Sequence, residues 1–94
     1  MMEIRQLDNG QRGKFTAFIN GKPAGLISYL ATDVGHISLM HTEVDDEFRG
    51  QNVGKQILEE IVEYARENNI LVTPLCPFTQ AMFQRHKEYA DVLI

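Results

Sequence analysis

The residues best suited to chemistry follow one another from position 41 to 55, in the order His-Thr-Glu-Val-Asp-Asp-Glu-Phe-Arg-Gly-Gln-Asn-Val-Gly-Lys. Gly50 and Gly54 would let a ligand approach the backbone, and Asn52 is a residue type that tolerates positive φ. Arg49 and Lys55 add positive charge. A helical pattern follows, and the first amides of a helix lack internal partners and carry the positive end of its dipole. This segment therefore predicts a cradle for a diphosphate.

The same residues could instead form an ordinary loop and helix start, with Arg49 and Lys55 as surface charges. A glycine-containing loop has predictive value when a strand precedes it and an amphipathic helix follows. The sequence provides both, which favours the anion-binding interpretation.

Three further residues could take part in group transfer, namely Cys76, His41 and Glu43. Cys76 precedes an expected helix, whose N-terminus would favour the thiolate, although a free cysteine is also commonly a small buried hydrophobe. His41 and Glu43 are expected on one face of a strand, together with Ile37 and Leu39. Either could deprotonate an amine, directly or through water. The alternatives are a hydrogen-bonded core histidine and a solvated carboxylate.

The first half of the chain has the pattern of strands separated by tight turns. The turn signals are Asn9-Gly10, Asn20-Gly21 and Asp33-Val34-Gly35. The expected strands cover residues 4–7, 14–19, 24–31 and 36–44. This half therefore predicts an antiparallel meander of four strands.

The second half changes to helical periodicity. Apolar residues at helical spacing predict a helix from positions 50–52 to Asn68. Residues 70–75 read as a short buried strand, which implies a parallel β-α-β crossover. Pro77 suits the first turn of a second helix, and the apolar tail 89–94 is expected to pack on the sheet. The predicted fold class is mixed α/β (α+β), with a twisted mixed sheet in a single domain over residues 1–94.

Composition limits the partners and the compartment. The net charge of -4 argues against nucleic acid or an anionic membrane as a partner. The single cysteine excludes an internal disulfide, and no signal-peptide or membrane-spanning apolar run is present. His36 and His41 are expected on opposite strand faces, and no metal-ligand spacing emerges. We expect a cytoplasmic monomer or weak homodimer without a bound metal.

The segment from Arg49 to Gly54 resembles the (Gln/Arg)-x-x-Gly-x-(Gly/Ala) motif of the GNAT superfamily of acyl-CoA-dependent N-acetyltransferases. Asn52 stands where that family usually has glycine. A closer resemblance is to a branch of short GNAT-like proteins, through His41-Thr-Glu-Val, Cys76-Pro-Phe and His86-Lys-Glu-Tyr. The resemblance covers essentially the whole chain. It implies the GNAT fold with acetyl-CoA as cosubstrate.

The resemblance also implies roles for individual residues. The diphosphate of CoA would bind the amides from Gln51 to Lys55, and the pantetheine arm would pair with Glu43 and Val44 like an added strand. The thioester would lie near Cys76, and Tyr89 would be either a general acid toward the thiolate or a packing residue. The implied coenzyme-binding residues are Glu43, Val44, Arg49, Gly50, Gln51, Asn52, Val53, Gly54 and Lys55.

Several functions stay open at this point. The first is transfer of acetyl from acetyl-CoA to an unidentified amine, with Glu43 or His41 as the base. The second is a non-catalytic acyl-CoA-binding module, because the resembling branch lacks the N-terminal helices that shape the acceptor pocket in longer relatives. Transfer through an acyl-Cys76 intermediate is a variant of the first. A hydrolase that uses Cys76, His41 and Glu43 is chemically sensible but would leave the cradle unexplained.

Overall fold

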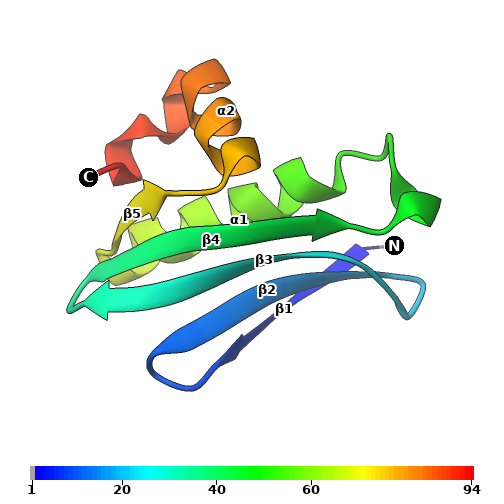
Figure 1. Cartoon of the computed structure of the whole chain (residues 1–94), viewed down its shortest axis with the longest axis horizontal. Helices are drawn as coiled ribbons and strands as arrows, with labels where there is room; N and C mark the ends of the chain where they lie inside the picture. The colour runs from blue at the N-terminus through cyan, green and yellow to red at the C-terminus, as the bar shows by residue number, and fades with distance from the viewer. Residues whose placement is uncertain (1) are drawn as a thin grey trace.

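The computed structural model describes residues 2–94, which form a five-stranded sheet with two α-helices (Figure 1). The strands, in their order across the sheet, are β1 (Met2–Asp8), β2 (Arg12–Ile19), β3 (Lys22–Asp33), β4 (His36–Val44) and β5 (Leu71–Pro74). The helices are α1 (Val53–Asn68), α2 (Pro77–Arg85) and two 3-10 helices, η1 (Asp46–Phe48) and η2 (Lys87–Val92). The strands β1 to β4 are antiparallel and β5 is parallel to β4, so the predicted fold class is confirmed.

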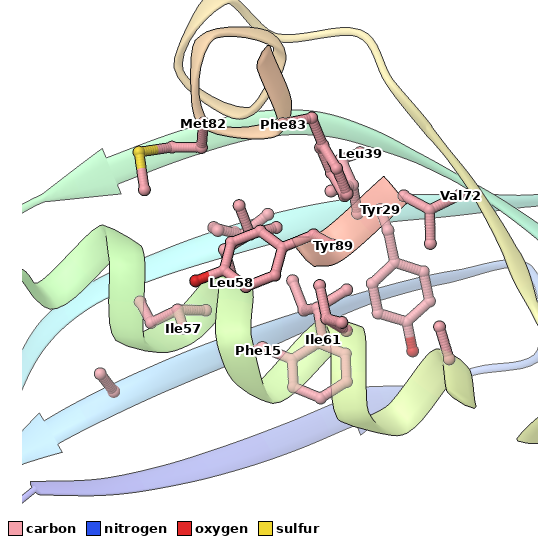
Figure 2. Packing of buried hydrophobic residues seen from close by; sticks show 14 of the residues in the cluster. Phe15, Tyr29, Leu39, Ile57, Leu58, Ile61, Val72, Met82, Phe83 and Tyr89 are labelled. Carbon is pink, nitrogen blue, oxygen red and sulfur yellow. The ribbon is translucent and has the colours of Figure 1, made fainter. Parts of the chain in front are cut away.

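The core lies between the sheet and the helices. Figure 2 shows side chains of the sheet, α1, α2 and η2 that meet there, among them Phe15, Leu39, Ile61, Phe83 and Tyr89. The apolar stripe of α1 is fully buried, as its helical spacing predicts. Burial of each large apolar side chain contributes about 1.5–3 kcal/mol. No helix within residues 2–94 has the length and hydropathy needed to cross a bilayer.

Both α-helices contribute side chains to this one core cluster, so they cover the same face of the sheet. The opposite face, called here the bare face, has no helix packed on it within residues 2–94. Its side chains alternate with the core residues, as strand geometry requires. Leu7 (63% exposed) on β1 and Met40 (44% exposed) on β4 are large apolar side chains left partly in solvent.

A β-bulge interrupts β4 at Met40. Tyr29 of β3 pairs with Leu39, whereas the preceding Ser28 pairs with His41, so one residue of β4 is extra. A bulge of this kind reverses the alternation of side chains beyond it. Thr42 pairs with the buried Ile27 and therefore faces the helices.

The bulge overturns two predictions about β4. His41 and Glu43 do share a face, but it is the bare face, whereas Ile37 and Leu39 are buried against the helices. The prediction that all four lie on one face is therefore wrong. His36 lies on the bare face as well, so it shares a face with His41 rather than opposing it. The assumption that side chains alternate between faces at every residue fails here, because nothing in the sequence marks the extra residue of the bulge.

The C-terminal segment returns to the sheet beside β5 (Figure 1). Leu93 forms a bridge with Val72, and the Ile94 N–H donates to the Val72 carbonyl at 3.2 Å. The guanidinium of Arg66 on α1 binds the Asp91 carboxylate at 2.9 Å and holds η2 in place. This hydrogen bond lowers the pKa of Asp91.

Candidate functional site

The sheet opens where β4 and β5 part. These strands pair only between residues 36–39 and 71–74. The Leu39 carbonyl then accepts hydrogen bonds from the amides of Leu75 (2.9 Å) and Cys76 (3.2 Å), and the chain leaves the sheet toward α2. Within residues 2–94, residues 40–44 pair with β3 alone, so the other edge of β4 has no strand partner there among the described residues. This free edge leads toward the N-terminus of α1.

A cavity of about 530 Å³ lies at that end of the sheet, between the start of α1 and α2. Its lining includes four basic residues and no carboxylate. The lining residues are Val44, Phe48, Arg49, Gly50, Asn52, Val53, Gly54, Lys55, Phe78, Met82, Arg85 and His86. A cavity with this lining favours an anionic ligand, although the chain as a whole is acidic.

The loop before α1 has two residues at positive φ. Gly50 has φ of +86°, and a Cβ there would meet nothing within 4 Å, so glycine is needed for its conformation rather than for space. Asn52 precedes the helix in the left-handed conformation with φ of +58°. The prediction that Asn52 can adopt positive φ is confirmed.

The first turn of α1 offers free amides to this cavity. The N–H of Gln56 bonds to the carbonyl of Asn52 at 3.0 Å, so the amides from Val53 to Lys55 have no partner within the helix. The amide of Gln51 donates to the Phe48 carbonyl at 3.3 Å, and Gln51 does not line the cavity. The available donors thus begin after Gln51.

Gly54 has a different role from the expected one. A Cβ on Gly54 would lie 2.7 Å from Cζ of Phe78, so glycine here allows the close contact between α1 and α2. Its φ is not positive. The space that was expected to admit a ligand to the Gly54 backbone is partly filled by the Phe78 ring.

The cations of the cavity differ in how they are paired. Arg49 Nε lies 2.8 Å from Asp46, Lys55 Nζ lies 3.7 Å from Glu59, and His86 Nδ1 lies 3.5 Å from Glu88. The guanidinium of Arg85 makes no ion pair or side-chain hydrogen bond within residues 2–94.

The contribution of α2 to the cavity was missed by the sequence reasoning. Phe78, Met82, Arg85 and His86 all come from α2 or its C-cap. Phe78, Met82 and Arg85 have the i, i+4, i+7 spacing of one helix face. That periodicity was available in the sequence, but nothing there indicated what the face would contact.

Cys76 is buried and lies where β4 and β5 part. Its Sγ is 3.2 Å from Oγ1 of Thr42 and 3.0 Å from Oγ1 of Thr79, and it does not line the cavity. Two hydroxyls can donate to a thiolate or accept from a thiol. Thr42 was missed because the bulge turns it toward the helices.

His41 and Glu43 form a separate pair on the bare face. Nε2 of His41 lies 3.6 Å from Oε1 of Glu43, and each side chain is 63% exposed. Thr42, which contacts Cys76, lies on the other face of the same strand. The hydrolase hypothesis requires Cys76, His41 and Glu43 to lie together, and the structure does not bring Cys76 to the other two residues.

Tyr89 is a buried residue that binds α1. Its hydroxyl donates to the Glu59 carboxylate at 2.8 Å, and burial, followed by this hydrogen bond, raises its pKa to about 12. It does not line the cavity. Within the described part of the chain, no group of three His, Cys, Asp or Glu residues is placed to hold a metal ion.

Comparisons with known proteins agree with this geometry. A profile of the GCN5-related N-acetyl-transferase family matches residues 14–92. The solution structure of a GCN5-like protein from Staphylococcus aureus is 36% identical, with a TM-score of 0.77 over 98% of this chain and 87% of that chain. No curated protein matches.

Two more distant structures show the same fold. The ribosomal-protein-S18-alanine N-acetyltransferase from Escherichia coli is 14% identical, with a TM-score of 0.77 over 90% of this chain and 76% of that chain. A GNAT family acetyltransferase from Elizabethkingia anophelis, solved with acetyl-CoA bound, is 12% identical, with a TM-score of 0.71 over 94% of this chain and 74% of that chain.

Proposed function

Because the chain belongs to the GCN5-related N-acetyltransferase family, we propose that it binds acetyl-CoA in the cavity between α1 and α2 and transfers the acetyl group to an amine. The observation that carries this proposal is the lining of the cavity. It combines free helix amides and basic side chains, and it has no carboxylate.

The residues of the cavity fit the parts of the coenzyme. The diphosphate binds the amides from Val53 to Lys55, where the helix dipole and the cations Arg49 and Lys55 favour negative charge. Phe78 and Met82 supply an apolar wall for the pantetheine arm. The arm follows the free edge of β4 past Val44 and Glu43, in the manner of an added strand.

The thioester then reaches the point where β4 and β5 part, beside Leu39 and Cys76. The amine attacks the thioester carbonyl, the carbon–sulfur bond breaks, and CoA leaves as the thiolate. The amine loses one proton to Glu43 or His41, directly or through water, from the bare face. Positioning of the amine against the thioester supplies most of the acceleration.

A second route is favoured by the surroundings of Cys76. Its thiol lies between two hydroxyls at the N-terminus of α2, a setting that can stabilise a thiolate able to accept the acetyl group from CoA. Against this route, Cys76 is only 6% exposed and packs like a structural cysteine. A non-catalytic acyl-CoA-binding module would use the same cavity without turnover.

The proposal is tested by calorimetric titration of acetyl-CoA, followed by intact mass and by thiol release with a panel of amines. We expect micromolar binding and amine-dependent thiol release that survives in Cys76→Ala. A mass gain of one acetyl group, lost in Cys76→Ala, would establish the relay instead. Binding without thiol release would support the binding module, and absence of binding would overturn the acyl-CoA assignment.

A further inference from the structure

The bare face contains a groove that the coenzyme cavity does not reach. Two depressions of about 420 and 330 Å³ share three lining residues, Arg12, Gly13 and Ser28. Together they define the bare-face groove. Its residues are Leu7, Asp8, Asn9, Arg12, Gly13, Lys14, Ser28, Tyr29, Leu30 and Met40. The groove thus crosses the sheet from β1 to β4.

One end of the groove lies at the bulge in β4. Met40 lines this end, and it follows Leu39, whose carbonyl marks the point where β4 and β5 part. The His41–Glu43 pair lies on the same face, immediately beyond Met40. An amine held here would have a proton acceptor beside it and the proposed thioester position next to it.

The floor of the groove is strand backbone, because Gly13 has no side chain and the Tyr29 ring is buried on the helix-covered face of the sheet. The Tyr29 hydroxyl donates to the Asp8 carboxylate and accepts a hydrogen bond from Nε2 of Gln6 at 2.7 Å. A Cβ on Gly13 would collide with the Tyr29 ring on the helix-covered face, so glycine is required there by the packing of the core. The groove is therefore formed by the packed sheet rather than by a loop.

The charges of the groove are unbalanced. The Asp8 carboxylate accepts hydrogen bonds from the Tyr29 hydroxyl, on the helix-covered face, and from the Gly10 amide at 2.6 Å, and these hydrogen bonds lower its pKa. Arg12 and Lys14 have no ion pair within residues 2–94. The groove therefore offers two unpaired cations on β2 and apolar side chains, including the exposed Leu7 and Met40, on either side of them.

We infer that the bare-face groove is the acceptor site, and that the acceptor is an amine with an apolar stem and a carboxylate at its far end. This inference rests on the proposed function. The amine lies at Met40 on β4, the stem crosses β3, and the carboxylate binds Arg12 on β2. Strands β4 and β2 are two strand spacings apart, about 10 Å, which corresponds to a stem of roughly seven or eight carbons.

The test is a ¹⁵N NMR titration with two probes of equal length, 8-aminooctanoate and 8-aminooctanamide, which differ in the carboxylate alone. We expect 8-aminooctanoate to shift the amides of Gly13, Ser28 and Met40 and to bind about two- to fivefold more tightly at low salt, as for an exposed ion pair. In Arg12→Gln both probes should bind equally weakly. Lys22→Gln is the matched control, because Lys22 is an exposed strand cation outside the groove.

Equal binding of the two probes, or a carboxylate preference that survives in Arg12→Gln, would overturn the inference. So would amide shifts confined to residues outside the groove. The same samples are titrated with acetyl-CoA, which should shift the amides from Val53 to Lys55. Failure of that second titration would count against the proposed function, whereas failure of the first with success of the second would count against the groove alone.

Discussion

The two halves of β4 share a partner on one edge and differ on the other. Residues 36–39 lie between β3 and β5, whereas residues 40–44 pair with β3 alone. On the helix-covered face, Ile37 and Leu39 in the first half are almost fully buried, whereas Thr42 and Val44 in the second half are only partly buried. The bulge at Met40 separates the two halves.

The two halves of β4 therefore differ in how far their surroundings constrain them. The first half is held by hydrogen bonds on both edges and by the core, so its side chains have little freedom to change. The second half keeps a free edge and leads into the loop that starts α1. The proposed coenzyme and acceptor sites both border this second half, on opposite faces of the sheet.

The largest expected effect comes from a substitution in the core-facing part of the first half of β4. Leu39 is fully buried, so Leu39→Ala should cost about 3 kcal/mol of unfolding free energy through lost burial and a residual cavity. His41→Ala in the second half should change it by less than about 0.5 kcal/mol, as for other surface substitutions. Urea unfolding followed by circular dichroism measures both. Similar losses for the two variants would show that the halves do not differ in this way.

Gly54→Ala tests the contact between α1 and α2, which lies near the second half of β4. The added Cβ overlaps the Phe78 ring, and overpacking of this kind should cost about 2 kcal/mol and weaken acetyl-CoA binding. The double variant Gly54→Ala/Phe78→Leu should recover most of the stability, because leucine vacates the ring position. If the double variant is no more stable than Gly54→Ala, then Phe78 is not the cause.

Much of the fold could be predicted from the sequence, because strand alternation, Asn-Gly turns and helical spacing are local signals. The positive φ of Asn52 in the loop before α1 was predicted for the same reason, since Gly50 and Asn52 lie between a strand and a helix start. The bulge could not be predicted, because a single extra residue depends on pairing with β3. For the same reason, the sequence could not predict on which face of the sheet His41 and Thr42 lie. The role of Arg85 depends on how α2 packs on α1, which is a tertiary contact without a local signal.

A smaller effect is expected at the positive-φ residue of the loop. Asn52→Val places a β-branched residue in the left-handed conformation and should cost about 1–2 kcal/mol, with a loss of about tenfold in acetyl-CoA affinity. Asn52→Gly keeps the conformation and should bind within about twofold of the parent chain. Calorimetry compares the three proteins. Equal affinity of the valine and glycine variants would separate coenzyme binding from the loop geometry.

A substitution of Arg85 tests whether α2 contributes positive charge to the cavity proposed for acetyl-CoA. Arg85→Gln should weaken acetyl-CoA binding by about two- to fivefold at low salt, as expected for an exposed pair, and by less as salt rises. Lys87→Gln is the control, because Lys87 is a neighbouring cation that does not line the cavity. An equal loss in both variants would mean that only the general charge of the C-terminal segment matters.

The smallest effect concerns the outer edge of β5. Leu93 and Ile94, which follow η2, pair with Val72 there, whereas the second half of β4 has a free edge. The pKa of Asp91 is lowered in the folded chain by its hydrogen bond with Arg66. Such a carboxylate stabilises the fold above its unfolded pKa of about 3.9, and this contribution is lost as pH falls through the lower folded value. Asp91→Asn should slightly lower the thermal midpoint at pH 7 and flatten its fall below about pH 4.

Thermal unfolding at pH 3, 5 and 7 measures this difference. It should be small because both partners are substantially exposed. Amide exchange at Ile94, whose N–H binds Val72, should quicken at pH 7 in Asp91→Asn while amides of the first half of β4 stay protected. If Ile94 keeps its protection and the pH curves coincide, the edge of β5 is closed by the Leu93 bridge and apolar packing without help from the ion pair.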